Sequence, residues 1–231
     1  MDAGLTMADD IDVSPLRADD ADAATATLVA AFARDPVLAD FLLRRGAHAA
    51  AAHDAFFRFN LTRGYLARPK SLALSSVLRS RGASNDNAIL GVALWAPPGP
   101  PGSSGLPLSE MLRMVTIAHT AFGVLGIGRA LRTGLRVDAA HPSTPHYFLG
   151  FLAVAPAHQG RGLGARLLAP VLARADAEGL PCYLENSNPK NTPFYERLGF
   201  VVQREVRLGG ADAPAVWCMW REPRAARAVT T

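Results

Sequence analysis

The chain has 231 residues, of which 49% are hydrophobic and 19% are charged, and its formal net charge at pH 7 is +4. This composition is typical of a globular protein that buries a core, and it excludes a mainly disordered or fibrous chain. The sequence contains no long uninterrupted apolar run and no basic segment before an apolar run at its N-terminus, so it predicts neither a membrane span nor a secretory signal.

Hydrophobic periodicity and turn residues predict the elements of the first half of the chain. In order, they are a flexible tail (1–11), a short strand around Val13, a helix that ends near Asp35–Pro36, a helical region over 39–66, and two strands (71–78 and 88–95) joined by a polar hairpin loop (82–87). The proline-rich segment Pro97–Gly102 ends the second strand, and one or two helices with an apolar face are expected over 108–136.

The second half gives a sharper pattern. The predicted elements are a strand (146–154), a helix (162–178), a strand (182–185), a short helix (193–198), a hairpin of two strands (201–208 and 215–220), and a flexible tail (222–231). In the short helix, Pro193 suits the first position and Gly199 lies just past the end.

A glycine-rich loop connects the strand at 146–154 to the next helix. Its sequence is Gln159-Gly160-Arg161-Gly162-Leu163-Gly164, and Ala165 follows. Glycines let a ligand approach the backbone closely, and the free amides at a helix N-terminus attract a pyrophosphate. The loop therefore predicts a nucleotide-type cofactor site.

Two interpretations fit this loop. Gly160-x-Gly162-x-x-Ala165, with Glu185 about twenty residues further on, fits the dinucleotide fingerprint of a nicotinamide oxidoreductase. Against it, the strand is separated from the first glycine, and the chain ends soon afterwards in an antiparallel hairpin. The alternative is an acyl-CoA site.

The loop resembles the main signature of the GNAT family of N-acetyltransferases, and a second segment resembles another part of that family. Asn191, Tyr195, Gly199 and Phe200 stand where the family has an Asn before a short helix, a Tyr within it and a final Gly-Phe. The resemblance is specific over 145–221 and weaker over 12–95. It implies an α/β (α+β) fold in which a mixed, mostly antiparallel sheet splits around acetyl-CoA, in a single domain over 12–221 with a variable acceptor-side insert at 97–145.

Within this family, the segments around His158, Ala173, Leu184, Pro193 and Trp217 resemble the puromycin N-acetyltransferase branch. Residues 97–145 show no comparable match. We therefore expect an N-acetyltransferase of this broad type, with the acceptor left open.

The resemblance implies direct acetyl transfer from acetyl-CoA to a primary amine. Tyr195 would protonate the leaving thiolate, and a backbone amide near Leu152 to Val154 would polarise the carbonyl. Glu185 is the candidate base, with His119, His141 and His146 as rivals. The predicted cofactor-binding residues are Leu152, Ala153, Val154, Gln159, Gly160, Arg161, Gly162, Gly164, Ala165 and Asn191.

The expected partner is a small-molecule amine, with acetyl-CoA as cosubstrate and with no nucleic acid, membrane or metal. A protein or peptide acceptor and a CoA-binding regulatory module without turnover remain alternatives. Cys182 and Cys218 are the only cysteines and have no partner histidine pattern, so we expect core thiols in a cytoplasmic protein.

Overall fold

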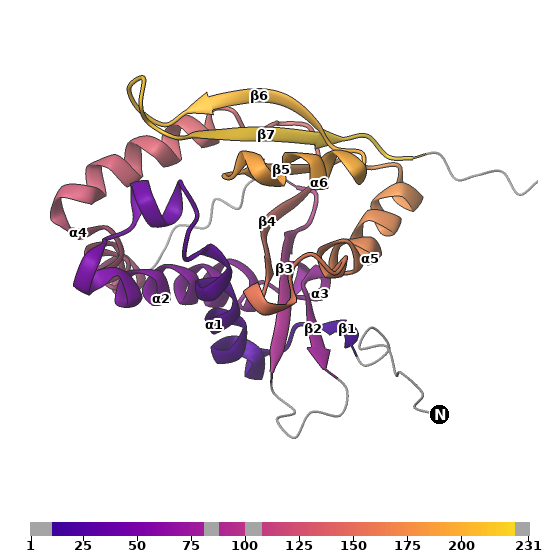
Figure 1. Ribbon diagram of the computed structural model, residues 1–231, viewed down its shortest axis with the longest axis horizontal. Coiled ribbons are helices and arrows are strands. Elements are labelled where there is room, and N and C mark those ends of the chain that lie inside the picture. Colours follow the sequence, from indigo (N-terminus) through magenta and orange to yellow (C-terminus); the bar gives the residue numbers. More distant parts are fainter. Residues whose placement is uncertain (1–10, 81–87, 100–107, 225–231) are drawn as a thin grey trace, which may run out of the picture.

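The computed structural model describes residues 11–80, 88–99 and 108–224, and its centre is a seven-stranded sheet (Figure 1). The strand order is β1-β2-β3-β4-β5-β7-β6, and every neighbouring pair is antiparallel except β4 with β5. The strands are β1 (Ile11–Pro15), β2 (Ser76–Ser80), β3 (Ile89–Ala96), β4 (Tyr147–Val154), β5 (Cys182–Asn186), β6 (Val201–Arg207) and β7 (Ala215–Arg221). The mixed, mostly antiparallel sheet that the resemblance implied is confirmed.

Helices lie on both sides of this sheet (Figure 1). The α-helices are α1 (Ala21–Phe32), α2 (Ala49–Phe59), α3 (Pro69–Leu74), α4 (Leu108–Asp138), α5 (Leu163–Glu178) and α6 (Thr192–Arg197). Short 3-10 or π-helical segments are η1 (Ala18–Asp20), η2 (Leu38–Leu42), η3 (Gly46–His48), η4 (Asn60–Leu66), η5 (Pro156–His158) and η6 (Pro189–Asn191). No helix in the described part of the chain is both long enough and apolar enough to cross a membrane.

The parallel pair at the centre of the sheet is short. β4 pairs with β5 only through Tyr147, Phe148 and Leu149, whereas its pairing with β3 continues to Val154. In Figure 1, β4 runs steeply across the view while β5 lies along β7, so the two strands diverge past Leu149. The sheet is therefore open on one side of the second half of β4.

Two hydrophobic clusters hold these elements together. The first joins α1, α2 and η4 to β3 and β4, with Leu28, Phe57, Leu61, Val92 and Ala153 buried in it. The second joins α5 and α6 to the sheet and includes Trp95, Leu167, Leu168, Leu184 and Met219. Burial of each large side chain contributes about 1.5–3 kcal/mol, so the clusters fix the helices on the two faces.

The strand predicted over 71–78 is wrong in its first half. Residues Pro69–Leu74 form α3, and β2 begins only at Ser76. Pro69 lies in the first turn, where its missing N–H leaves no helical bond unmade. The Ser75 hydroxyl donates to the Ser71 carbonyl at 2.8 Å and accepts the Trp95 N–H at 3.2 Å, which fastens the end of α3 to β3.

Other predicted elements match more closely, with small shifts at their ends. Ile11, which we assigned to the N-terminal tail, is the first residue of β1. The hairpin loop predicted at 82–87 and residues 100–102 of the proline-rich segment lie outside the described residues.

The predicted helical region at 108–136 is α4, interrupted at Gly123, where φ is +68° and the backbone is not helical. Its predicted apolar face is only partly buried. Ala121 is buried, but Leu125 is 97% exposed and Leu131 is 63% exposed. Phe122, which belongs to the predicted face, does pack against the first hydrophobic cluster, as does Ala130, which was not predicted.

Candidate functional site

The second half of β4 offers unpaired backbone groups. The Ala155 N–H donates to the Leu90 carbonyl on β3 at 2.8 Å. Because N–H and C=O groups alternate sides along a strand, those of Leu152 and Val154 point away from β3, toward the opening between β4 and β5. The Gln159 side chain donates to the Val154 carbonyl at 2.9 Å, which confirms this direction.

The glycine loop follows β4 after the short helical segment η5. Gly160 has a φ of +76° and Gly162 a φ of +74°, so both take a conformation that residues with a side chain rarely adopt. Gly162 is the N-cap of α5, a helix of 16 residues, and no described side chain caps it. The first-turn amides, including that of Ala165, therefore remain available to an anion and lie at the positive end of the helix dipole.

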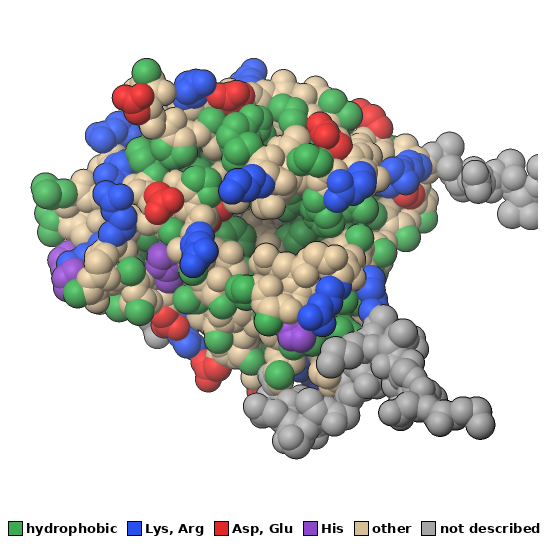
Figure 2. Space-filling view, viewed as in Figure 1, with side chains coloured by type: hydrophobic (Ala, Val, Ile, Leu, Met, Phe, Trp, Pro, Cys, Tyr) green, Lys and Arg blue, Asp and Glu red, His purple; other side chains and the backbone are tan. Residues whose placement is uncertain are grey.

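A cavity of about 860 Å³, which we call the glycine-loop groove, lies along these elements. The space-filling view shows a hollow near the middle of this face, with hydrophobic side chains around it and Lys or Arg side chains on either side (Figure 2). Eight of the predicted site residues line the groove: Leu152, Val154, Gln159, Gly160, Gly162, Gly164, Asn191 and Tyr195.

Three predicted cofactor residues do not line the groove. Ala153 is 2% exposed and packs into the first hydrophobic cluster on the opposite side of β4. The Arg161 side chain is exposed to solvent beyond the lining, and Ala165 adds only its backbone at the start of α5.

Several residues of the groove were not predicted from the sequence. Arg34 and Asp35 follow the end of α1, His158 ends η5 and Arg197 ends α6. Arg34 and Arg197 place positive charge where a pyrophosphate would lie. His158 stands next to Gln159 in a segment that resembles the family but carries no predicted role, and nothing in the sequence brings Arg34 next to a loop more than a hundred residues away.

The groove ends at Tyr195, on α6. Its side chain is 9% exposed and its ring packs against those of Phe194 and Phe200, with centroids 5.0 and 6.0 Å away. Burial raises the pKa of Tyr195, and the negative charge of Asp35 raises it further. The phenol therefore keeps its proton at neutral pH and is suited to act as a proton donor.

Asp35 is itself held in place at the end of α1. Its carboxylate accepts the N–H groups of Val37 at 3.0 Å and Leu38 at 2.8 Å, and the hydroxyl of Ser187 donates to its other oxygen. These contacts connect α1 to the segment after β5. They fix one wall of the groove to the other.

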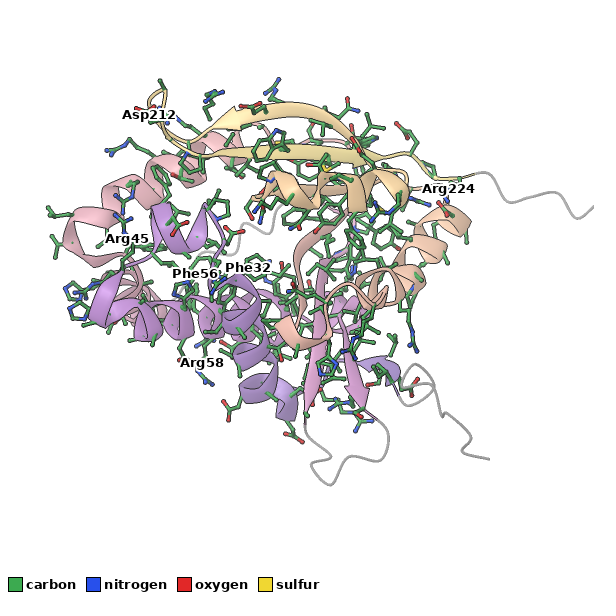
Figure 3. All side chains as sticks on the ribbon, viewed as in Figure 1. Phe32, Arg45, Phe56, Arg58, Asp212 and Arg224 are labelled. Atoms are coloured by element: carbon green, nitrogen blue, oxygen red, sulfur yellow. The ribbon has the colours of Figure 1, made fainter. Side chains whose placement is uncertain are left out.

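A second cavity, of about 420 Å³, opens on the other side of Tyr195, and we call it the aromatic cavity. It shares four lining residues with the groove: Phe32, Leu152, Asn191 and Tyr195. Figure 3 shows Phe32 and Phe56, which line it, in the region between helices α1 and α2 and the β6–β7 hairpin. The two cavities thus meet at the Tyr195 side chain.

Glu185 lies in the lining of the aromatic cavity, near the end of β5. Its Oε1 is 3.2 Å from Nδ1 of His141, and the two side chains are 19% and 23% exposed. The structure therefore brings together two of the residues predicted as rival bases. A carboxylate that contacts an imidazole is a chemically sound proton acceptor.

The other candidates lie elsewhere. Nδ1 of His146 is 2.6 Å from the Thr144 carbonyl, and burial lowers the pKa of this imidazole. His146 packs between Tyr183 and Trp220 and lines neither cavity. His119 is exposed on α4. Both histidines fit structural or surface roles better than a catalytic one.

The two cysteines are buried in strands β5 and β7. Burial raises the pKa of the Cys182 thiol to about 12 and raises that of Cys218 above its usual value. Both remain protonated thiols, which makes them poor nucleophiles. Within the described ranges, no three His, Cys, Asp or Glu side chains gather in a way that could hold a metal ion.

Comparisons with known proteins give a consistent result. The chain is 40% identical over 62 residues to an uncharacterized N-acetyltransferase of Schizosaccharomyces pombe. This match spans 27% of the chain and 25% of that relative, so the chain covers only about a quarter of its relative's length.

Solved structures show the same fold over nearly the whole chain. One, titled as histone acetyltransferase HPA2 and related acetyltransferase from Corynebacterium glutamicum, has a TM-score of 0.64 and 24% identity, with 94% of this chain and 99% of that one covered. A polyamine N-acetyltransferase of Drosophila melanogaster has a TM-score of 0.60 and 16% identity, with 92% and 100% covered.

The family assignment rests on a longer sequence match. The model of the acetyltransferase (GNAT) family matches residues 83–200, just over half of the chain. The match includes β4 and the glycine loop. Family members use acetyl-CoA as cosubstrate, which fits a groove lined by free helix amides and unpaired strand groups. The chain belongs to the acetyltransferase (GNAT) family.

Proposed function

We propose that this protein is an acetyl-CoA-dependent N-acetyltransferase that acetylates the primary amine of a small molecule directly. The observation that carries this proposal is the meeting of two cavities at Tyr195. One is lined by backbone suited to a pyrophosphate and its attached arm, and the other is a largely aromatic cavity whose lining includes Glu185.

Each wall of the glycine-loop groove has a role in holding acetyl-CoA, which supplies the acetyl group when bound. The amides of Gly160, Gly162 and Gly164 face the pyrophosphate, with Arg34 and Arg197 nearby. The backbone groups of Leu152 and the N–H of Val154 hydrogen-bond the extended pantetheine arm, as a neighbouring strand would.

Three groups of the chain perform the chemistry. The Glu185 carboxylate accepts the proton that the acceptor amine loses, and His141 orients that carboxylate. A backbone N–H of β4, at Leu152 or Val154, stabilises the negative charge that develops on the carbonyl oxygen. Tyr195 donates its proton to the departing sulfur, so CoA leaves as a neutral thiol, and the resulting phenolate takes a proton back from solvent before the next turnover.

The test is release of CoA from acetyl-CoA by the purified protein with a panel of acceptors. The panel contains puromycin, which the resemblance to that branch of the family suggests, together with aminoglycosides, polyamines, aryl amines, amino acids and short peptides. Acceptor-dependent release with a small amine is expected. Turnover of peptides alone would favour the alternative of a peptide acetyltransferase, and CoA binding without any turnover would favour a regulatory module.

Tyr195→Phe is run in parallel, with Tyr147→Phe as its control. Tyr147 is a similarly buried tyrosine whose hydroxyl bonds Glu178 outside both cavities. Loss of a general acid lowers kcat about 100-fold or more, so the first variant should be slow and the second nearly normal. Equal rates in both variants would remove the role given to Tyr195.

A further inference from the structure

The walls of the aromatic cavity are built largely from rings. The aromatic residues that line it are Phe32, Phe56, Tyr65, Phe122, Phe148, Phe151 and Tyr195. Phe151 is central, since its ring centroid lies 6.0 to 6.3 Å from those of Phe32, Phe56 and Tyr65. Such walls favour a hydrophobic, ring-sized guest, because the rings can pack edge-to-face against it.

The cavity has little charge. Among the described residues that line it, Glu185 is the only charged side chain. The other polar lining groups are neutral, such as Asn60 and Thr133. One carboxylate is enough to receive one amine. A second ammonium group on the same guest would be left among rings without a counter-charge, which is costly.

The polar end of the cavity also includes the Tyr65 hydroxyl. It lies against Gly150 so closely that a Cβ placed on Gly150 would be 1.8 Å from the hydroxyl oxygen. Gly150 is the extra residue of a bulge in β4, just beyond its last pair with β5. Burial raises the pKa of Tyr65, and the charge of Glu185 raises it further, so this hydroxyl is neutral, and it lines the same cavity as that carboxylate.

We infer that the acceptor is a primary monoamine with a hydrophobic ring, an arylalkylamine in chemical class. Its ring packs among Phe56, Phe122 and Phe151, and its nitrogen lies at Glu185 and the Tyr65 hydroxyl. The cavity volume of about 420 Å³ falls within the range of small-molecule sites. This inference rests on the proposed function, because it names the acceptor of the same reaction.

The test compares kcat/KM for 2-phenylethylamine, ethylamine, spermidine and a tetrapeptide with a free N-terminus. Burial of one phenyl group should favour 2-phenylethylamine over ethylamine by about tenfold to a hundredfold. Spermidine should be a poor acceptor despite its greater charge. Equal efficiencies for the first three, or preference for spermidine, would overturn the inference and leave the proposed function standing. Turnover of the tetrapeptide alone would overturn both.

Binding is measured as well, so that a slow reaction cannot hide the result. Calorimetric titration of 2-phenylethylamine into the protein with CoA present should show binding that Glu185→Gln weakens. No binding would overturn the inference even where another amine is acetylated.

Variants of the ring walls give a second check. Phe56→Leu and Phe122→Leu should reduce the preference for 2-phenylethylamine over ethylamine about threefold to tenfold. The matched control is Phe57→Leu, because Phe57 is fully buried and contacts Phe56 and Phe151 but does not line the cavity. An unchanged preference in the first two variants, or the same loss in all three, would contradict the proposed position of the ring.

Discussion

The glycine-loop groove and the aromatic cavity share Tyr195 but are built from different parts of the chain. The groove combines the backbone of one short stretch, the end of β4 and the start of α5, with residues from the end of α1 and from α6. The cavity uses side chains from α1, α2, η4, α4, β4 and β5. The backbone part of the groove depends on a few glycines, so most substitutions leave it unchanged. In the aromatic cavity, a single side-chain substitution can change which molecule binds. We therefore expect most substitutions in the aromatic cavity to change the acceptor without changing the acetyl donor.

Glu185→Gln should give the largest effect, confined to the aromatic cavity. Loss of the proton acceptor should lower kcat/KM for the amine about 100-fold and leave the KM for acetyl-CoA nearly unchanged. Initial-rate kinetics with each substrate varied in turn would measure both. Glu205→Gln is the control, since Glu205 is exposed on β6 and pairs only at the surface with Arg207. A large rise in the KM for acetyl-CoA would show that the two sites are not separate.

Asp176→Asn tests the scaffold behind the groove. Asp176 on α5 receives two hydrogen bonds, of 2.7 and 2.8 Å, from the buried Arg221 of β7, and Arg221 holds the pKa of this carboxyl below its usual value. The variant leaves the Arg221 charge without its partner. Because Asp176 is one-quarter exposed, we expect a loss of about 2 kcal/mol, below the range for a fully buried pair.

Thermal unfolding measures that loss, and a Tm lower by about 4–8 °C is expected for a chain of this size. Asp54→Asn is the control, because Asp54 pairs with Arg58 at the surface, where an ion pair contributes less than about 1 kcal/mol. At 25 °C the KM for the amine should not change. An equal drop in Tm for both variants would argue against the importance of the Asp176–Arg221 contact.

Gly162→Val should affect only the glycine-loop groove. A valine at a φ of +74° is strained by about 1–3 kcal/mol, and its side chain stands where the cofactor phosphates would lie. We expect the KM for acetyl-CoA to rise about tenfold with the KM for the amine unchanged. Gly210→Ala, in the β6–β7 turn where an added Cβ meets no atom within 4 Å, provides the control. Unaltered acetyl-CoA kinetics would place the cofactor elsewhere.

The pH dependence gives the smallest effect. A phenol is a donor only below its pKa, and burial raises the pKa of Tyr195, so the donor form persists to higher pH than for a free tyrosine. We therefore expect Tyr195 to cause no loss of kcat between pH 8 and about pH 10. The pH profiles of the native enzyme and of Tyr195→Phe should then have the same shape over this range. A decline in kcat that is present in the native enzyme and absent from the variant would show that Tyr195 titrates normally.

The sequence predicted the glycine-loop groove better than the aromatic cavity, because the residues of the glycine loop are neighbours in the chain and those of the cavity are not. The residues Gln159, Gly160, Gly162 and Gly164 are neighbours in the chain, and their spacing alone indicates a loop before a helix. Glu185 and His141 were each candidates, but they are 44 positions apart and only the fold brings them into contact. The role of Phe56 and Phe122 in one cavity wall could not be predicted, because nothing local links α2 to α4.

Fold prediction failed where short apolar runs have no clear period. Ser71–Leu74 suits a strand as well as a helix by composition, and only the packing of α3 against β3 decides between them. Leu125 and Leu131 belong to the apolar face expected over 108–136, yet both are largely exposed on α4, which is interrupted at Gly123. The single domain over 12–221 stays a prediction, supported by strands from both halves of the chain in one sheet.

The contact of Tyr65 with Gly150 has a consequence for how this protein can diverge. Any residue larger than glycine at position 150 would occupy the place of the Tyr65 hydroxyl, so the first step alone is unfavourable. A shorter side chain at position 65 would open that place and permit alanine at 150. Descendants of this protein that alter one of the two positions should alter the other as well, and a pair of substitutions 85 positions apart would then mark a change of acceptor.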